Sequence, residues 1–195
     1  MDPVIKIMNY RGSVVGRWSV PRTKRQVRYA VEKLLKLYFR CKSTNLLTRE
    51  LLTVIKTYAE RLWKMCVELF ILKPELVPLI QEILQAEPEK YEEEIVMEKM
   101  RRHETKRCSL CGVRLVYPAY VIYRKGGVIV KESAPVGIFC LTEIAGKLRD
   151  LITRIDTAVR TDKGAVLPFE KTQREKKQIQ GKLFEEVDHA VKTYA

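Results

Sequence analysis

The chain has 195 residues, of which 46% are hydrophobic and 31% are charged, and its formal net charge is +13. This much apolar material excludes a disordered tail protein and is enough for one compact domain or two small ones. The positive charge favours polyanionic partners, nucleic acid first and anionic membrane second. The most apolar stretch, residues 63–72, is interrupted by charges and too short to cross a bilayer, so we expect no membrane span.

The charge is clustered in two basic blocks that flank an acidic one. Residues 1–42 hold 11 Lys/Arg against 2 Asp/Glu, residues 74–98 hold 1 against 8, and residues 99–131 hold 9 against 1. Clustered cations are typical of proteins that contact successive phosphates. Asparagine is scarce while Lys, Arg and Glu abound, a composition that resembles proteins from hyperthermophiles.

The N-terminal segment, residues 1–20, is predicted to be a basic extended arm that Trp18 anchors on the fold. Ser19 and Pro21 are typical of a helix start, and this helix is expected to run to about Cys41. Apolar residues recur along it at steps of three and four, and basic residues recur with the same steps on the opposite face. We predict that the arm and this basic face bind nucleic acid, the competing interpretation being a solvated surface. The residues assigned to this role are Arg11, Arg17, Arg22, Arg25, Arg28, Tyr29, Lys33, Lys36 and Arg40.

Three further helices are expected before the chain changes character. Thr48 should cap a helix that runs to about Leu72 and packs antiparallel to the first. Pro74 begins a short third helix, and Pro88 precedes a fourth, over residues 89–103. The glutamates of that last segment come first and its basic residues last, which suits a helix dipole. We therefore interpret the acidic run as a helix feature rather than a metal site.

The next segment, residues 113–130, is rich in β-branched and aromatic residues around a Gly126-Gly127 turn, which predicts a β-hairpin. A helix over residues 141–160 should follow. The expected fold class is mainly α, with antiparallel helices, plus a small β-hairpin and zinc-knuckle insertion, and thus α+β overall. The expected organisation is a basic arm over residues 1–20, a helical domain over 21–104, a zinc-knuckle, hairpin and helix module over 105–162, and a charged helical tail over 163–195.

Three of the five cysteines form a pattern typical of zinc sites. Cys108 and Cys111 make a C-x-x-C knuckle followed by glycine, a hairpin comes next, and Cys140 falls where a helix begins. Residues 105–160 thereby resemble the treble-clef class of zinc site, which implies structural zinc. That class supplies a second ligand from the helix start, where this chain has Glu143, and His103 before the knuckle is the other candidate for the fourth ligand.

Two other interpretations of the cysteines stay open. The knuckle thiols could be reduced and buried without a metal, or they could form a disulfide, which hyperthermophile cytoplasm permits. Cys41 and Cys66 fall near opposite ends of the two antiparallel helices, and either a disulfide or plain apolar packing would account for them.

The second basic block lies beside the knuckle and is also predicted to contact nucleic acid, with the helix dipole as the competing explanation. Its candidate residues are Arg101, Arg102, Lys106 and Arg107. No catalytic set is visible, because the chain has only two histidines and lacks the common phosphate-binding and nucleophile motifs. We therefore expect a protein that is not an enzyme.

A basic arm that enters two antiparallel helices resembles the helical coat proteins of filamentous archaeal viruses, over residues 1–72. The resemblance implies a nucleocapsid or capsid protein of a hyperthermophilic archaeal virus that coats DNA, rather than RNA, without sequence preference and as a homo- or hetero-oligomer. No signal peptide is visible, so we expect a virion or cytoplasmic protein. The alternatives are a zinc-containing archaeal transcription regulator and a subunit of an RNA–protein complex.

Overall fold

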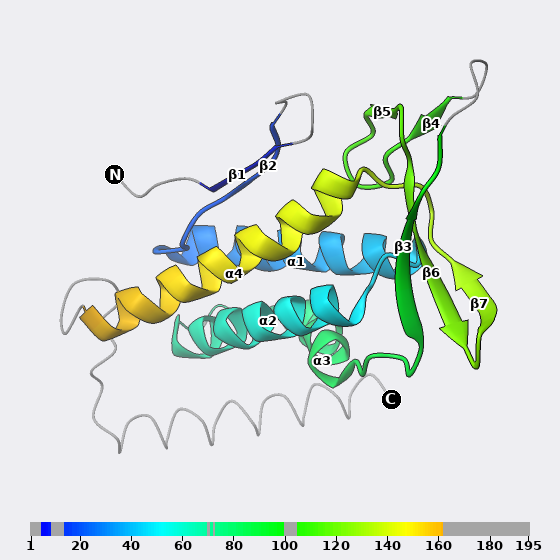
Figure 1. Ribbon diagram of the computed structural model, residues 1–195. Coiled ribbons are helices and arrows are strands. Elements are labelled where there is room, and N and C mark those ends of the chain that lie inside the picture. Colours follow the sequence, from blue (N-terminus) through cyan, green and yellow to red (C-terminus); the bar gives the residue numbers. More distant parts are fainter. Residues whose placement is uncertain (1–4, 9–13, 70, 72, 100–104, 162–195) are drawn as a thin grey trace.

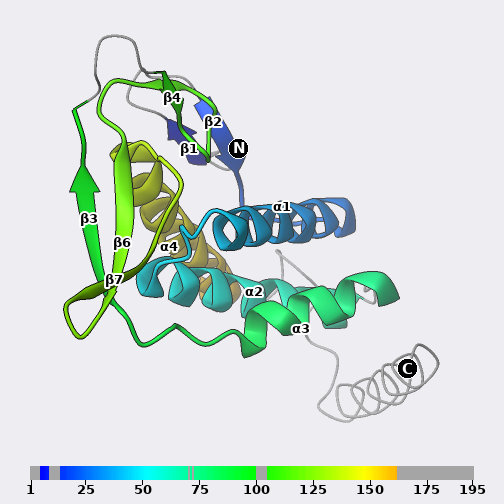
Figure 2. The ribbon, with the colours of Figure 1, turned by 90° about the vertical axis from the view of Figure 1, so that its right-hand side faces the viewer.

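The computed structural model describes residues 5–8, 14–69, 71, 73–99 and 105–161, and the expected tail over 163–195 lies outside them. The fold class is α+β, as predicted (Figure 1). A helical layer contains α1 (Lys24–Ser43), α2 (Arg49–Leu69), the single 3-10 turn η1 (Pro74–Leu76) with α3 (Val77–Gln85), and α4 (Ile138–Thr161). A sheet stands across one end of this layer (Figures 1 and 2).

Helix α1 begins later than the sequence suggested. A capping box closes its start: the Gln26 N–H donates to Thr23 Oγ1 at 3.3 Å, and the Thr23 N–H donates to Gln26 Oε1 at 3.1 Å. The start predicted at Ser19 and Pro21 is wrong, because only the Thr23–Gln26 pair satisfies two free backbone N–H groups at once. The predicted apolar face is confirmed as buried, from Val27 to Tyr38.

Helix α2 runs antiparallel to α1 and is capped as predicted, with the Leu51 N–H donating to Thr48 Oγ1 at 3.2 Å (Figure 1). Helix α4 packs against α2, and Arg61 holds Asp156 with two hydrogen bonds of 2.6 and 3.0 Å. The buried apolar residues of the helices and of the sheet form one continuous cluster. The described residues of the two middle segments, 21–104 and 105–162, therefore share a core. No described helix is long and apolar enough to span a membrane.

The fourth helix expected over residues 89–103 is wrong. Its described part forms strand β3 (Glu92–Met97), which pairs antiparallel with β6 (Ala119–Lys125), and β7 (Val128–Glu132) flanks β6 on the other side. The β-branched residues of this segment suit a strand, and its partner lies far along the chain, where local periodicity gives no signal.

The acidic run has a different role from the one predicted. Glu94 pairs with Arg124 of β6 at 3.2 Å, and Glu89 pairs with Lys131 of β7. The carboxylate of Glu93 accepts the backbone N–H of Arg49, at 2.9 and 3.1 Å, at the first residue of α2. Glu93 of the acidic run therefore stabilises a helix dipole, because a carboxylate is favourable at a helix N-terminus. The helix is α2 and not the one expected over residues 89–103.

The N-terminal segment is a hairpin rather than an arm in its described residues. Strand β1 (Ile5–Met8) pairs antiparallel with β2 (Val14–Trp18), and β1 lies against α4 (Figure 1). Trp18 is buried and meets Tyr58 edge to face, with ring centroids 5.9 Å apart, so its predicted anchoring role is confirmed.

The hydroxyl of Tyr58 is buried without a hydrogen-bond partner among the described residues. Burial raises the pKa of this phenol, so the group stays neutral. Because an unpaired buried hydroxyl contributes only its desolvation cost, Tyr58→Phe should leave the free energy of unfolding unchanged or raise it by up to about 1 kcal/mol. Urea denaturation checks this, with Tyr58→Ala as the control that should lose several kcal/mol; a loss of more than about 1 kcal/mol in Tyr58→Phe would contradict it.

Candidate metal centre and basic surface

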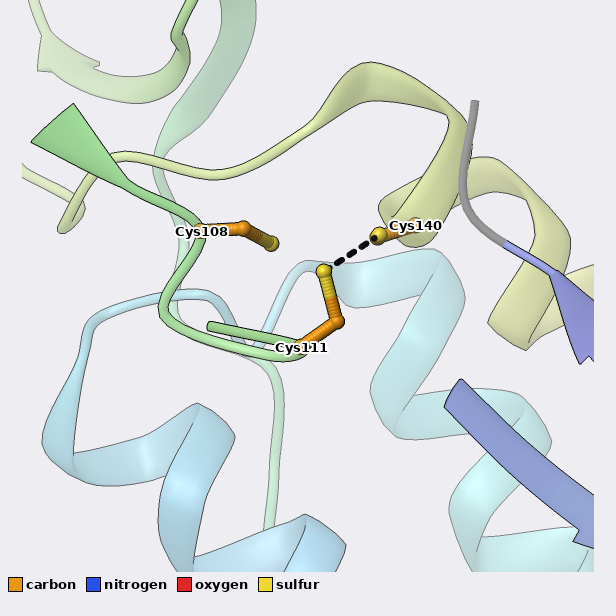
Figure 3. A group of neighbouring side chains, drawn as sticks. All are labelled: Cys108, Cys111 and Cys140. Atoms are coloured by element: carbon orange, nitrogen blue, oxygen red, sulfur yellow. Dashed lines mark hydrogen bonds between the residues drawn. The ribbon is translucent and has the colours of Figure 1, made fainter. Parts of the chain in front are cut away.

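Three cysteine thiols converge at the junction of a small hairpin and a helix. Cys108 and Cys111 lie in the loop between β4 (Lys106–Arg107) and β5 (Arg114–Leu115), and Cys140 lies in the first turn of α4 (Figure 3). All three Sγ atoms are within 4.8 Å of one another, and those of Cys140 and Cys111 are 3.4 Å apart. The predicted cysteine cluster is therefore formed.

The loop that carries two of these thiols has the backbone of a tight knuckle. The Gly112 N–H donates to the Cys108 carbonyl at 2.7 Å, and the Cys108 N–H donates to the Val113 carbonyl at 2.8 Å. Gly112 has a φ of 74°, a left-handed conformation in which a side chain would be strained. The glycine after the C-x-x-C motif thus lets the chain turn tightly just beyond the second cysteine.

The start of α4 approaches the knuckle closely at Gly137, whose N–H donates to Cys108 Sγ at 3.4 Å. The Cys140 thiol, followed by the backbone N–H groups of Gly137, Cys111 and Leu110, lowers the pKa of Cys108 to about 5, against the opposing effect of burial. The hydrogen bond to Cys108, together with burial, raises the pKa of Cys140. The directions of these two shifts favour a thiolate at Cys108 and a protonated thiol at Cys140.

The donor set fits a single soft metal ion. Tetrahedral zinc bound at about 2.3 Å places its sulfur ligands about 3.8 Å apart. The three Sγ atoms, all within 4.8 Å, match that arrangement with small shifts. Among the described His, Cys, Asp and Glu side chains, none joins the three cysteines in this group.

The structure describes only one of the two candidates for the fourth ligand. The carboxylate of Glu143 lies 3.9 Å from the ammonium of Lys147 on the surface of α4, and the structure does not bring it into the cysteine group. His103 lies outside the described residues.

None of the five cysteines is in a disulfide. Cys41 and Cys66 are buried apolar fillers of the helical core, and burial raises their pKa values to about 12 and about 11. The disulfide alternatives raised by the sequence are therefore not found.

The exposed side of α1 carries the cations that the sequence placed there. The helix exposes Arg25, Arg28, Tyr29, Lys36 and Arg40, and Arg22 is exposed just before the cap residue Thr23. Tyr29 is 60% exposed. Lys33 is half-buried, with its ammonium 5.0 Å from the ring centroid of Trp18 and 5.1 Å from that of Tyr29, and burial lowers its pKa.

The remaining predicted nucleic-acid residues divide into two groups. Arg11, Arg101 and Arg102 lie outside the described residues, and Arg17 lies on β2, where its side chain is not described. Lys106 is engaged within the fold, because its ammonium bonds to the Tyr120 hydroxyl at 2.6 Å and to Glu98 at 3.0 Å, and these bonds raise its pKa.

Two arginines contact the loop of residues 108–112, the metal loop, and the sequence did not reveal this feature. Arg40, at the end of α1, donates to the Leu110 carbonyl at 3.1 Å, and Arg107, on β4, donates to the Gly112 carbonyl at 3.1 Å. Only the tertiary fold brings α1 to this loop, 70 residues further along the chain.

A cleft of about 590 Å³ between the ends of α1 and α3 and the sheet was also missed by sequence reasoning. The two lysines that line it are paired: Lys42 bonds to Glu82 at 2.6 Å, and Lys131 pairs with Glu89.

Comparison with known proteins gives no relative: no protein-family model, no curated protein and no solved structure matches this chain.

Proposed function

We propose that this chain is a structural protein that binds nucleic acid without sequence preference and coats DNA. The observation that carries the proposal is α1, whose buried apolar face fixes the helix while its opposite side presents exposed cations to solvent. Such a face binds phosphates by displacing their counterions. The role is structural rather than catalytic.

The chemistry of this face favours contacts to the nucleic-acid backbone. Arg25, Arg28 and Lys36 are exposed on one helix, at spacings that let them follow successive phosphates. Phosphate contacts give affinity and orientation but carry no sequence information. The exposed ring of Tyr29 adds a surface on which a sugar or base can pack.

We propose zinc as the ion of the cysteine group, because thiolate ligands select zinc among the common divalent ions. Bound there, zinc would supply ligation only, tying the first turn of α4 to the β4–β5 hairpin through Cys108, Cys111 and Cys140. His103 or Glu143 would complete the set. Metal content of His103→Ala and Glu143→Gln proteins, measured by elemental analysis, separates these two ligands.

The setting we propose is the nucleocapsid of a hyperthermophilic archaeal virus, with several copies of the chain along the DNA. Support comes from the order of elements, a basic N-terminal segment followed by the antiparallel pair α1 and α2. The competing settings are an archaeal transcription regulator and an RNA–protein complex. A binding assay that compares random-sequence duplex DNA, selected DNA and RNA distinguishes these three settings.

The test of the α1 surface is the salt dependence of DNA binding. The triple variant Arg25→Ala, Arg28→Ala and Lys36→Ala should bind a random duplex more weakly and reduce the slope of log K against log salt by about 3. The matched control removes the same charge elsewhere, through Lys64→Ala, Lys73→Ala and Arg154→Ala, all exposed. Fluorescence anisotropy at several salt concentrations measures the affinity and its salt dependence for both triple variants. If the two triple variants lose DNA affinity equally, the attraction comes from the overall charge of the protein, and α1 does not carry a binding face.

A further inference from the structure

Strand β7 forms one edge of the three-stranded sheet, whose order is β3-β6-β7. Among the described residues it pairs only with β6, and Figure 1 places it at the end of the molecule away from the helices. At the end of the strand, the Glu132 carbonyl accepts the side-chain amide of Asn45 at 3.1 Å. Within the part of the chain that the structure describes, the backbone edge of residues 128–131 is therefore open to a further strand.

The side chains of this edge are apolar and exposed. Val128, Ile129 and Val130 follow one another in the chain and are 69%, 53% and 49% exposed. A strand with one face on a core alternates apolar and polar residues, so the packing of this sheet does not account for three exposed apolar residues in a row. Such an edge pairs with another strand unless charges or a proline prevent it.

The only cation of β7 is held away from this role. The ammonium of Lys131 lies 4.5 Å from the ring centroid of Tyr123 and 5.3 Å from that of Tyr91, and it pairs with Glu89. These contacts hold the charge over two aromatic rings of its own chain. The lysine therefore does not protect the apolar part of the edge.

The opposite edge of the sheet, β3, has the protection that β7 lacks. It also exposes apolar residues, at positions 95–97, but positions 92–94 before them are all glutamate. Successive acidic side chains on an edge repel the same edge of a second copy. The two edges therefore differ, since β3 is protected by charge and β7 is not.

The sequence of β7 fits a second copy of itself. Val-Ile-Val reads the same in both directions, so an antiparallel pair centred on Ile129 places Val128 of one copy opposite Val130 of the other. The exposed charges at the two ends have opposite signs, with Lys125 at the hairpin tip and Glu132 at the far end. An antiparallel arrangement brings unlike ends together, whereas a parallel arrangement brings like ends together.

We propose that β7 is the interface of a homodimer, in which two copies pair their β7 strands antiparallel about a two-fold axis at Ile129. The two sheets then join into one continuous sheet with β3 at each outer edge. Because glutamates protect β3, the assembly closes at two copies instead of growing into a fibre. The inference goes beyond the proposed function, since this dimer forms without nucleic acid.

Sedimentation velocity of the full chain without nucleic acid tests the dimer. An interface made by one short strand pair is small, so we expect reversible dimerisation with a Kd of about 1–100 μM. Ile129→Lys should weaken dimerisation by about tenfold or more, because it removes apolar contact and places two like charges opposite each other at the axis. Circular dichroism checks that the variant is folded, as expected for a half-exposed position.

The matched control is Met97→Lys, the same change at an exposed apolar residue of the opposite edge. It should dimerise as the wild type does. If Ile129→Lys and Met97→Lys weaken the dimer equally, the added charge and not the β7 edge governs association, and the proposal is wrong.

Mixing two charge variants tests the register. Ile129→Lys and Ile129→Glu should each be mainly monomeric, because each places like charges at the axis. Their mixture should form a heterodimer, because unlike charges then lie opposite each other. If both variants are folded and the mixture stays monomeric, the two copies do not meet at Ile129, which refutes the proposed interface.

The outcomes also separate the dimer from the proposed function. A wild type that is still monomeric at about 200 μM overturns the dimer and leaves a strand of another protein as the occupant of the edge. That result does not affect the α1 surface, whose test is DNA binding. Conversely, a chain that binds no nucleic acid refutes the proposed function, while the sedimentation experiment still decides on the dimer.

Discussion

Cys140→Ser should lose the zinc ion that we propose for the cysteine group and lower the melting temperature by about 10 °C. Cys140 is the thiol that connects α4 to the knuckle, with its Sγ 3.4 Å from that of Cys111. A serine hydroxyl is a poor ligand for zinc, so the variant loses the stabilisation that the ion gives to the folded state. An ion present at 100 to 1,000 times its Kd contributes about 3–4 kcal/mol, and each kcal/mol moves the melting temperature of a chain of this size by about 2–4 °C.

Elemental analysis and scanning calorimetry on the purified chain measure the two effects. Cys66→Ala is the matched control, because it also removes a buried cysteine but lies in the helical core, away from the metal group. It should keep the ion while losing some stability. Retention of one ion per chain by Cys140→Ser, or an unchanged melting temperature of the wild type after chelation, would contradict the metal centre.

Leu151→Ala should lower the free energy of unfolding by about 2–5 kcal/mol. Leu151 is 0% exposed in α4 and belongs to the continuous core that joins this helix to α1 and α2. Truncation removes buried methyl groups and leaves a cavity that tightly packed neighbours fill only in part. Urea denaturation measures the loss.

The control for this substitution is Arg154→Ala, on the exposed side of the same helix. It should change the free energy of unfolding by less than about 0.5 kcal/mol. A Leu151→Ala protein as stable as this control would mean that α4 does not pack on the helical layer as described.

The helices were predictable because each has one buried face with a regular period. The faces of α1 and α2 follow directly from the spacing of their apolar residues, and so does the face of α4. The knuckle was predictable from C-x-x-C and its glycine, and Cys140 from its place at a helix start. These signals are local, since each depends on residues within a few turns or within one loop.

What the sequence did not reveal depends on partners distant in the chain. The segment of β3 has glutamates in an order that also suits a helix. Only its pairing with β6 shows that it is a strand. The role of Glu93 as a cap for α2 and the bond from Arg40 to the metal loop are contacts of the same kind. In each case the sequence shows the charged side chain but not the distant residue that it contacts.

The contacts that fasten the sheet and α4 to the other helices also bear on how the chain folds. Glu93 reaches Arg49 across 44 positions, the Asn45 amide bonds to Glu132 across 87, and Arg61 reaches Asp156 across 95. Helices form locally and fast, whereas such contacts require long loops to close at an entropic cost. We therefore expect the closing of those loops to limit the rate of folding of this protein, after its helices have begun to form.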